Sequence, residues 1–522
     1  MGISVLSAAL LAVACVLSAF DPLHMLQLES YQLPGYFRWL RQNPGRAFAR
    51  QCLPSLGAFA ALALMRLLAQ NGYSQLVASL AALLLSVLVY VQVKRLPAKK
   101  PLVVTKRAFR LLLVQLALGF ALSLALLLPF VWPAAYLLPA LSCLSLALSA
   151  VLAAPMERAV NNWYFRDAQR MLLAREGLIR VGITGSYGKT STKFILGTIL
   201  QEKYRVLVTP SSFNTPMGVT RVIREQLRPE HEVFVAEMGA RHVGDIREMC
   251  QLVHPTLGLL TSVGPQHLET FGSIEKVAAT KNELIDCLPE DGQAYFAADG
   301  GWCEVLYAQC RKQKTLAGLK EGAPFCAKDI SVSPSGTSFT LVTPQGEIPC
   351  VSPLLGKHNV QNVVLCAAAA QGLGLSLEQI ASGIAKLEPV EHRLQLIHGA
   401  GGVTVIDDAF NANPEGARAA MEVLSGFPGR RVVVTPGLVE LGEEEAERNR
   451  ALGRQIAAAA DIALLVGKEK RVQPLFEGLE EAGFPKANAH RMENLDQATA
   501  FLAQNGRPGD VVLFENDLPD NY

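Results

Sequence analysis

The sequence lacks the features expected of a disulfide-bonded, zinc-binding or nucleic-acid-binding protein. Its ten cysteines are scattered and none forms a Cys-x-x-Cys pair, which argues against a zinc ribbon and is typical of a reducing compartment. Only 18% of the residues are charged and the net charge is +2, so no broad basic surface for nucleic acid is expected. The length of 522 residues predicts about three to four domains.

Acidic residues are almost absent from the first 155 residues. This part has twelve Lys or Arg but only Asp21 and Glu29, a charge of +10, so the remainder must carry −8. It also contains five apolar stretches, each close to the ~20 residues that cross a bilayer. They are about residues 3–20, 52–70, 75–93, 111–131 and 134–154. These features predict an α-helical transmembrane domain; a soluble helix bundle is disfavoured because the last two stretches have almost no polar face.

The basic residues between these stretches predict their orientation. Four Arg lie between the first and second stretches and seven Lys or Arg between the third and fourth, whereas 71–74 and 132–133 have none. By the positive-inside rule, the two basic loops face the cytoplasm. We therefore expect a multi-pass cell-membrane protein, in contact with membrane lipid, whose chain after about residue 155 is cytoplasmic.

A strand, a glycine-containing turn and a helix follow from residue 178. Glycines let backbone N–H groups surround phosphate oxygens, and the helix N-terminus adds positive partial charge. Lys189 would reach the β- and γ-phosphates of ATP, and the Thr190 hydroxyl would bind Mg²⁺. The usual phosphate loop has glycine where this chain has Ile183, so the loop is a variant. We expect the phosphates to be held by Gly185, Ser186, Gly188, Lys189, Thr190 and Ser191.

Further polar blocks follow the loop. Glu237 ends an apolar strand, which suits a carboxylate ligand of Mg²⁺ at a sheet edge. Asn359 and Asn362 share one face of a helical turn, and their amides can both donate and accept hydrogen bonds. Arg393 offers a cation that can bind bidentately. Taken singly, Glu237 or Asn359 could instead be a helix cap, and Lys281 a solvated helix residue.

Together these blocks resemble the Mur ligase family over about residues 178–440. The most specific block, Asp407-Asp408-Ala409-Phe410-Asn411-Ala412-Asn413-Pro414, is similar to the branch that adds D-alanyl-D-alanine to a muramyl tripeptide. The resemblance implies an ATP-dependent ligase for peptidoglycan biosynthesis, which activates a carboxylate as an acyl phosphate and joins it to an amine. We expect a multi-domain chain, with transmembrane residues 1–155, an α/β P-loop ATPase domain at 156–396 and a Rossmann-like α/β domain at 397–522.

The resemblance also implies individual roles. The metal would be two Mg²⁺ ions, bound by Thr190, Glu237 and His267. Asn214 would contact the migrating phosphoryl group, and Lys281 would be carbamylated. The nucleotide contacts implied are Asn359 and Asn362 to the adenine, Arg393 to the phosphates and Asp408 to the ribose.

Two departures from the family concern the substrates. Typical members begin with a soluble domain that holds the UDP part of a UDP-sugar, and here apolar stretches occupy that place, which makes a lipid-linked acceptor credible. Related ligases usually have Lys-Gly-Ser where this chain has Glu515-Asn516-Asp517. These residues either select a differently charged amine or form a solvated strand end.

Three other functions compete with a cell-wall peptide ligase. A ligase for another envelope polymer, such as a polyglutamate-type chain, is less consistent with the block at 407–414. An ATP-driven transporter would need a coupling signature such as LSGGQ, which the sequence lacks. A catalytically dead membrane scaffold would not need to retain Lys189, Glu237, His267, Lys281 and Arg393 together.

Overall fold

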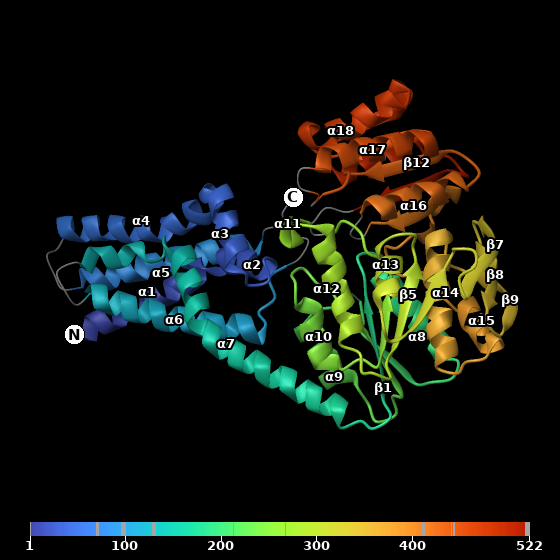
Figure 1. Ribbon diagram of the computed structural model, residues 1–522. Coiled ribbons are helices and arrows are strands. Elements are labelled where there is room, and N and C mark those ends of the chain that lie inside the picture. Colours follow the sequence, from blue (N-terminus) through green and yellow to red (C-terminus); the bar gives the residue numbers. More distant parts are fainter. Residues whose placement is uncertain are drawn as a thin grey trace. The chain divides into compact units, whose positions relative to one another are not determined.

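The computed structural model describes residues 2–68, 73–95, 101–127, 132–211, 213–266, 268–409, 413–439, 441 and 444–516. It divides into two compact units, a helical unit, Met1–Trp163, and an α/β unit, Tyr164–Tyr522. The boundary falls inside the long helix α7, Ser142–Leu173 (Figure 1).

The helical unit is built from seven helices and one 3₁₀ turn in its described residues. They are α1 (Gly2–Ser18), α2 (Phe20–Leu28), α3 (Leu33–Gln42), α4 (Pro44–Leu68), α5 (Ser74–Lys94), α6 (Lys106–Leu127), η1 (Trp132–Leu137) and α7 (Ser142–Leu173). Four of them, α4 to α7, are long and apolar enough to cross a membrane. The pair α1 and α2, bent by 42°, would make a fifth span if counted as one.

The fifth apolar stretch differs from the sequence-based expectation. A span over 134–154 was expected, but residues 132–137 form the 3₁₀ turn η1 and the long helix begins only at Ser142. Helix α7 then continues through Pro155 to Leu173. The apolar composition ends near residue 154, but the polar residues after it still form helix, so hydropathy did not mark the helix end.

Large apolar side chains on the long helices of this unit point outward. Leu56 on α4 is 63% exposed and Leu84 on α5 is 65% exposed. In water, such apolar surface on every long helix would be unfavourable. Two acids of this unit are paired with arginines: Arg46 lies 3.0 Å from the buried Asp21, and Arg110 donates to both oxygens of Glu157 at 2.6 and 2.7 Å.

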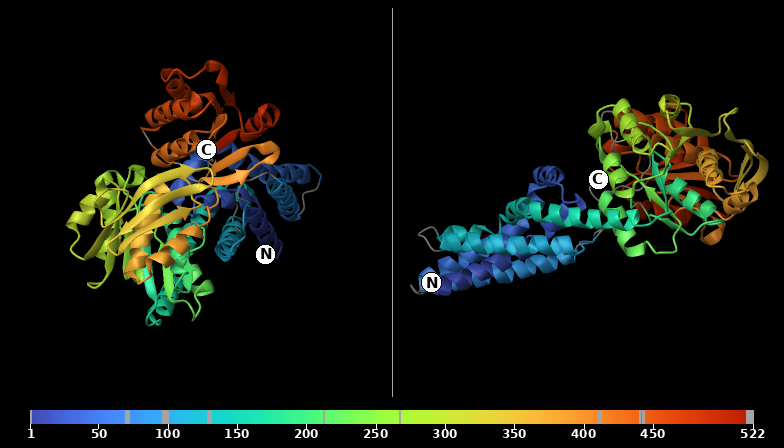
Figure 2. Two further views of the ribbon diagram at one scale, coloured as in Figure 1. Left: turned by 90° about the vertical axis from the view of Figure 1, so that its right-hand side faces the viewer. Right: turned by 60° about the horizontal axis from the view of Figure 1, so that its bottom comes forward.

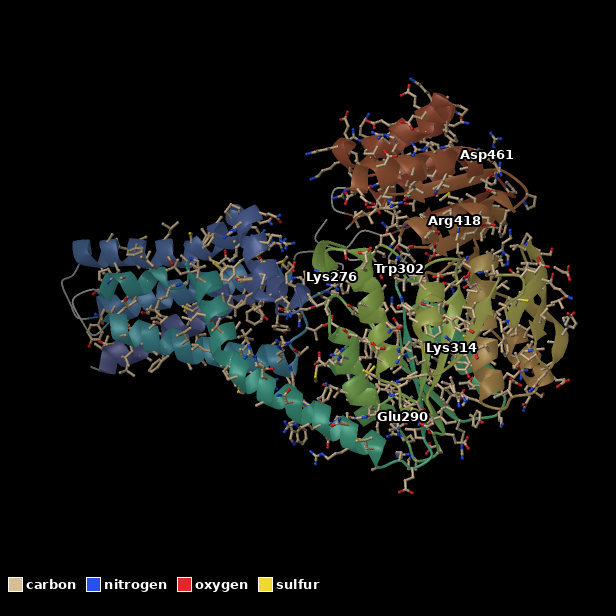
Figure 3. All side chains as sticks on the ribbon, viewed as in Figure 1. Lys276, Glu290, Trp302, Lys314, Arg418 and Asp461 are labelled. Carbon is tan, nitrogen blue, oxygen red and sulfur yellow. The ribbon has the colours of Figure 1, made fainter. Side chains whose placement is uncertain are left out.

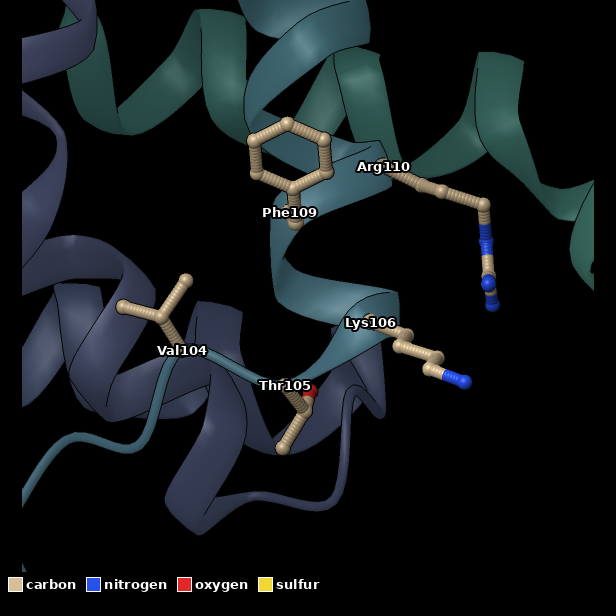
Figure 4. A pocket seen from close by; sticks show the side chains of 5 residues that line it. All are labelled: Val104, Thr105, Lys106, Phe109 and Arg110. Atoms are coloured by element: carbon tan, nitrogen blue, oxygen red, sulfur yellow. The ribbon is translucent and has the colours of Figure 1, made fainter.

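A pocket lies at the start of α6. It is lined by Val104, Thr105, Lys106, Phe109 and Arg110, with Lys106 and Arg110 extending to the same side (Figure 4). The Arg110 guanidinium is engaged by Glu157 within the helical unit. All the predicted catalytic residues lie in the α/β unit.

The first sheet of the α/β unit has nine strands in the order β2-β3-β1-β4-β5-β6-β7-β8-β9. Strands β1 to β7 run parallel to one another, whereas β8 pairs antiparallel with β7, and β9 pairs antiparallel with β8. The strands are β1 (Ile179–Thr184), β2 (Val206–Val208), β3 (Val233–Glu237), β4 (Leu257–Leu260), β5 (Gln293–Ala298), β6 (Gln313–Gly318), β7 (Phe325–Ser333), β8 (Gly336–Thr343) and β9 (Gly346–Ser352).

Helices cover both faces of this sheet (Figures 1 and 2). Strand β3 shows why, since Val235 joins one core and Phe234 the opposite core, both fully buried. One face carries α8 (Lys189–Leu200), α14 (Lys357–Gly372) and α15 (Leu377–Ala385). The other carries α9 (Pro216–Gln226), α10 (Asp245–Val253), α12 (Ile274–Asp286) and α13 (Trp302–Gln309), and α11 (Leu268–Phe271) precedes α12. A parallel sheet covered on both faces collects functional groups at the carboxyl ends of its strands.

The second sheet has six strands in the order β10-β11-β15-β12-β13-β14, parallel except for β10. Its strands are β10 (Gln395–His398), β11 (Thr404–Asp408), β12 (Arg431–Thr435), β13 (Ile462–Val466), β14 (Ala489–Met492) and β15 (Val511–Glu515). The helical segments around it are η2 (Ala400–Gly402), α16 (Pro414–Ser425), α17 (Glu445–Ala459), α18 (Glu469–Glu481), η4 (Lys486–Asn488) and α19 (Leu495–Asn505). Charged side chains such as Lys276, Glu290 and Arg418 are exposed on the surface of the unit (Figure 3).

Candidate active site

The glycine-containing loop between β1 and α8 is tied to the segment that follows β4. Ser186 Oγ donates to the carbonyl of Gly264 at 3.0 Å, and Tyr187 N donates to Ser262 Oγ at 2.8 Å. Gly185 has no room for a side chain, because a Cβ atom there would collide with Thr261 Oγ1. The sequence therefore needs glycine at position 185 to let the loop approach its neighbour.

The second glycine of the loop starts helix α8. Gly188 has φ +78°, a conformation that L side chains rarely adopt, and it is the N-cap residue of the helix. Lys189 follows, and its Nζ atom donates back to the carbonyls of Gly185 at 2.6 Å and Ser186 at 2.9 Å. Thr190 and Ser191 are half-buried in the first turn of α8. The loop thus curves around its own lysine, as a phosphate-binding turn requires.

Glu237, at the carboxyl end of β3, is held by two neighbours. Lys193 on α8 lies 3.1 Å from Glu237 Oε2, and Asn214 donates to Oε1 at 2.9 Å. Glu237 is 1% exposed, and Lys193 is fully buried and also donates to the carbonyl of Ser211. The sequence motifs did not identify Lys193. Its position one helical turn after Lys189, on the same face of α8, was the available signal.

Lys281 on α12 is buried beside the loop lysine. It is 2% exposed. Burial, reinforced by the positive charge of Lys189, lowers the pKa of Lys281 to about 7, against the opposing influence of Asp245 and Glu283. The alternative of a solvated helix residue is therefore wrong. At neutral pH a large share of the Lys281 amines carry no proton.

The pKa of Lys189 is influenced by charged residues beside both sheets of the unit. Burial lowers the pKa of Lys189 to about 8; the charge of Glu237 opposes this shift, and that of Arg393 adds to it. Burial also lowers the pKa of Arg393, while the carboxylates of Asp408, Glu237 and Glu515 act in the opposite direction. The structure therefore brings three charges close enough to influence one another. They belong to Lys189 at the start of α8, Glu237 at the end of β3 and Arg393 in the segment before β10.

The two predicted adenine ligands differ in their surroundings. Asn362 lies against the loop, since a Cβ atom on Gly188 would be 3.0 Å from its Oδ1 atom. Asn359 donates instead to the carbonyl of Leu355 at 2.8 Å, in the segment just before α14. Asn359 is not the helix cap, because the N-cap residue is Gly356. The structure thus brings Asn362 to the loop and gives Asn359 a bond to the segment that precedes its helix.

Asp408 and Glu515 are register partners at the carboxyl ends of β11 and β15. Asp408 Oδ1 accepts a hydrogen bond from Leu394 N at 3.1 Å. Glu515 is fully buried and Asn516 is 9% exposed, so the alternative of a solvated strand end is wrong for these two residues. Asp517 lies outside the described residues, as do His267, Ser212 and the segment 410–412.

Glu237 and Thr190 are the described residues that offer oxygen ligands for a metal ion beside the loop. Within the described ranges, no group of three or more His, Cys, Asp or Glu side chains is arranged to hold a metal ion. A site with a single carboxylate fits Mg²⁺, which is commonly bound through one or two carboxylates with phosphate oxygens and water.

Comparisons with known proteins identify relatives of the α/β unit. The Mur ligase middle domain matches residues 183–370, and the Mur ligase, glutamate ligase domain matches residues 392–515. The UDP-N-acetylmuramoyl-tripeptide--D-alanyl-D-alanine ligase of Escherichia coli (strain K12) is 36% identical over 306 residues, covering 58% of this chain and 67% of that protein. The protein of the same name from Bacillus subtilis (strain 168) is 31% identical over 340 residues, covering 64% of this chain and 72% of that protein.

Solved structures show the same relationship. MurF from Acinetobacter baumannii has a TM-score of 0.62 at 29% identity, covering 68% of this chain and 77% of that chain. The MurF ligase from Thermotoga maritima, solved in complex with ADP, has a TM-score of 0.61 at 27% identity, covering 68% of this chain and 80% of that chain. Sequence and fold agree, and the chain belongs to the Mur ligase family of ATP-dependent, ADP-forming ligases.

Proposed function

We propose that the chain is a membrane-anchored ligase of cell-wall synthesis that joins D-alanyl-D-alanine, or a closely related amine, to the carboxylate of a muramyl peptide. The observation that carries the proposal is the convergence of Lys189, Glu237, Lys281 and Arg393 around one glycine-containing loop. The names of the relatives supply the substrates.

The loop would bind ATP through residues 185–191. Its backbone N–H groups and the start of α8 favour an anion, and Lys189 would exchange its bonds to loop carbonyls for bonds to phosphate. Arg393 would stabilise the charge on the transferred phosphoryl group, Asn214 would contact that group, and Asp408 would bind the ribose. Asn362, beside Gly188, is better placed for the nucleotide than Asn359.

Magnesium would be held by Glu237 and Thr190, with His267 as a further ligand. When bound, the ion neutralises phosphate charge during phosphoryl transfer. Glu237 already has Lys193 and Asn214 on its two oxygens. These contacts fix the carboxylate at the strand end and balance its charge inside the unit.

Lys281 is suited to carbamylation. A neutral amine can attack carbon dioxide, forming an N–C bond and releasing one proton, and a pKa of about 7 keeps part of Lys281 neutral at physiological pH. The carbamate would replace a positive charge beside Lys189 by a negative one. This change would stabilise the ammonium form of Lys189 and add an anion beside the metal.

The helical unit would anchor the enzyme in the membrane, with the catalytic part in the cytoplasm. Support comes from four helices of sufficient length and hydropathy, a possible fifth, and the outward-facing leucines. We retain 1–155, 156–396 and 397–522 as the proposed domains. A membrane location makes a lipid-linked muramyl peptide a suitable acceptor, alongside the UDP-linked form.

The test is ADP release by the detergent-purified full-length protein. Each acceptor, UDP-linked or lipid-linked, would be offered with and without D-alanyl-D-alanine, using Lys189→Ala as the inactive variant and Lys320→Ala as a surface control. Turnover that needs both substrates and disappears only in Lys189→Ala is the expected result. Protein that binds ATP but turns over with neither acceptor would refute the assigned substrates.

A further inference from the structure

The pair of acids at the carboxyl ends of β11 and β15 has an unusual feature. Asp408 and Glu515 face each other in register on neighbouring parallel strands. Glu515 is fully buried, yet no N–H or O–H group in the described part of the chain donates to either of its carboxylate oxygens when both acids are ionised. Buried polar atoms in proteins are nearly always paired, so this carboxyl group requires an explanation.

A single proton between the two acids supplies it. Two ionised carboxylates are both acceptors and repel each other, whereas one proton gives an O–H···O hydrogen bond and leaves one net negative charge. Burial and the charge of Asp408 hold the pKa of Glu515 well above its usual range, against the opposing charge of Arg393. Burial, together with the charge of Asp407, also raises the pKa of Asp408, although Arg393 and hydrogen bonds from Leu394 and Glu515 oppose this.

The backbone around the pair is strained in a way that concerns Arg393. His392, Leu394 and Asn516 all have positive φ, at 58°, 46° and 69°. Non-glycine residues hold such values only where surrounding contacts enforce them. Arg393 lies between two of these residues, and the N–H of Leu394 donates to Asp408 at 3.1 Å.

The third of these residues, Asn516, is held by two hydrogen bonds. Asn516 N donates to the carbonyl of Asp408 at 3.2 Å, and Asn516 Nδ2 donates to the carbonyl of Gly437 at 2.6 Å. Asp408 is therefore bonded to the segment that carries Arg393 and to the residue that follows Glu515. Any change in how Asp408 is oriented would be transmitted to the Arg393 backbone.

We propose that Glu515 is a positioning residue. Its carboxyl group keeps a proton, donates a hydrogen bond to Asp408 and thereby fixes Arg393 for the phosphates of ATP. The proposal rests on the proposed function insofar as Arg393 binds ATP. Glu515 does not touch the nucleotide, but acts through Asp408 and the Leu394 hydrogen bond. The net charge of −1 on the pair also balances the guanidinium of Arg393.

Two substitutions distinguish this role from simple packing. Glu515→Gln keeps a buried donor without a titrating proton, whereas Glu515→Ala removes the donor. Glu493→Ala, in an exposed residue after β14, is the control. The affinity for ATP would be measured by titration calorimetry on the full-length protein in detergent, and thermal unfolding would be recorded for each variant.

Glu515→Ala is expected to weaken ATP binding by about tenfold or more, with Glu515→Gln and the control within about twofold of the wild type. Raising the pH should weaken ATP binding by the wild type, because the pair loses its shared proton, but should leave Glu515→Gln unaffected. A carboxyl whose pKa is raised by folding stabilises fully below its unfolded pKa and loses that contribution as pH rises through its folded pKa. The thermal stability of Glu515→Gln, measured relative to that of the wild type, should therefore increase as pH rises.

Several outcomes would overturn the proposal. They are unchanged ATP affinity in Glu515→Ala, equal weakening in Glu515→Gln and Glu515→Ala, or a pH dependence that persists in Glu515→Gln. If Glu515→Ala fails to fold, the pH dependence of ATP binding by Glu515→Gln and by the wild type still tests the proposal. Wild-type protein that shows the expected ATP binding without amine-dependent turnover would contradict the proposed substrates and leave this inference intact.

Discussion

Replacing Lys193 by Met is the substitution whose cost can be worked out most directly. Lys193 is fully buried and Glu237 is 1% exposed, and their charged atoms lie 3.1 Å apart. Lys193→Met leaves Glu237 with Asn214 as its hydrogen-bond donor but without a countercharge. Removing one partner of a buried ion pair costs about 3–5 kcal/mol, a large part of the ~5–15 kcal/mol stability of a typical protein.

The assay is thermal and urea unfolding of the full-length protein in detergent. The matched control is Lys320→Met, because Lys320 lies 2.6 Å from Glu304 but is 54% exposed, and such surface pairs contribute about 0–1 kcal/mol. The double variant Lys193→Met/Glu237→Gln removes the unpaired charge and should recover most of the loss. Equal stability of Lys193→Met and Lys320→Met, or no recovery in the double variant, would refute the reasoning.

Three further predictions concern the loop, the buried lysine and the junction with the C-terminal part. Activation of the enzyme by bicarbonate should fade as pH falls below about 7, because protonated Lys281 cannot form a carbamate; pH-dependent turnover with and without bicarbonate tests this. Gly185→Ala should abolish detectable ATP binding in calorimetry, since the new methyl group collides with Thr261, whereas Gly301→Ala should not. Leu355→Ala removes a side chain that is 3% exposed within the C-terminal core, and should lower the unfolding free energy by about 2–5 kcal/mol in denaturant titration.

Strand positions in the second sheet were largely predictable. Apolar runs within 403–409, 430–437, 462–467 and 511–516 correspond to β11, β12, β13 and β15. Strands β10 and β14 could not be predicted in this way. Both are four residues long at the sheet edges and contain polar residues such as Gln395 and Arg491, so they lack the apolar runs that mark buried strands.

The candidate site was predictable as a set of motifs, but its internal contacts were not. The glycine loop and Glu237 were identified because their residue types suit phosphate and metal chemistry, whereas Lys281 and the role of Arg393 came from the resemblance to the Mur ligase family. Lys193 was missed because a lysine in an amphipathic helix normally faces solvent, and only the fold shows that this one is buried against Glu237. The depressed pKa of Lys281 likewise depends on neighbours that are distant in sequence.

The junction between the two sheets explains how distant residues form one site. Leu355, just before α14, belongs to the same buried core as Leu394 and Val423 of the C-terminal part. The ion pair between Lys357 and Glu422 lies at the same junction, but both side chains are about half exposed, so apolar packing contributes more there. Leu394 also donates to Asp408 and adjoins Arg393, so burial of this core orders the Arg393 segment. In the proposed reaction an acyl phosphate must be kept from water, and a packed junction that orders Arg393 would link phosphoryl transfer to the exclusion of solvent.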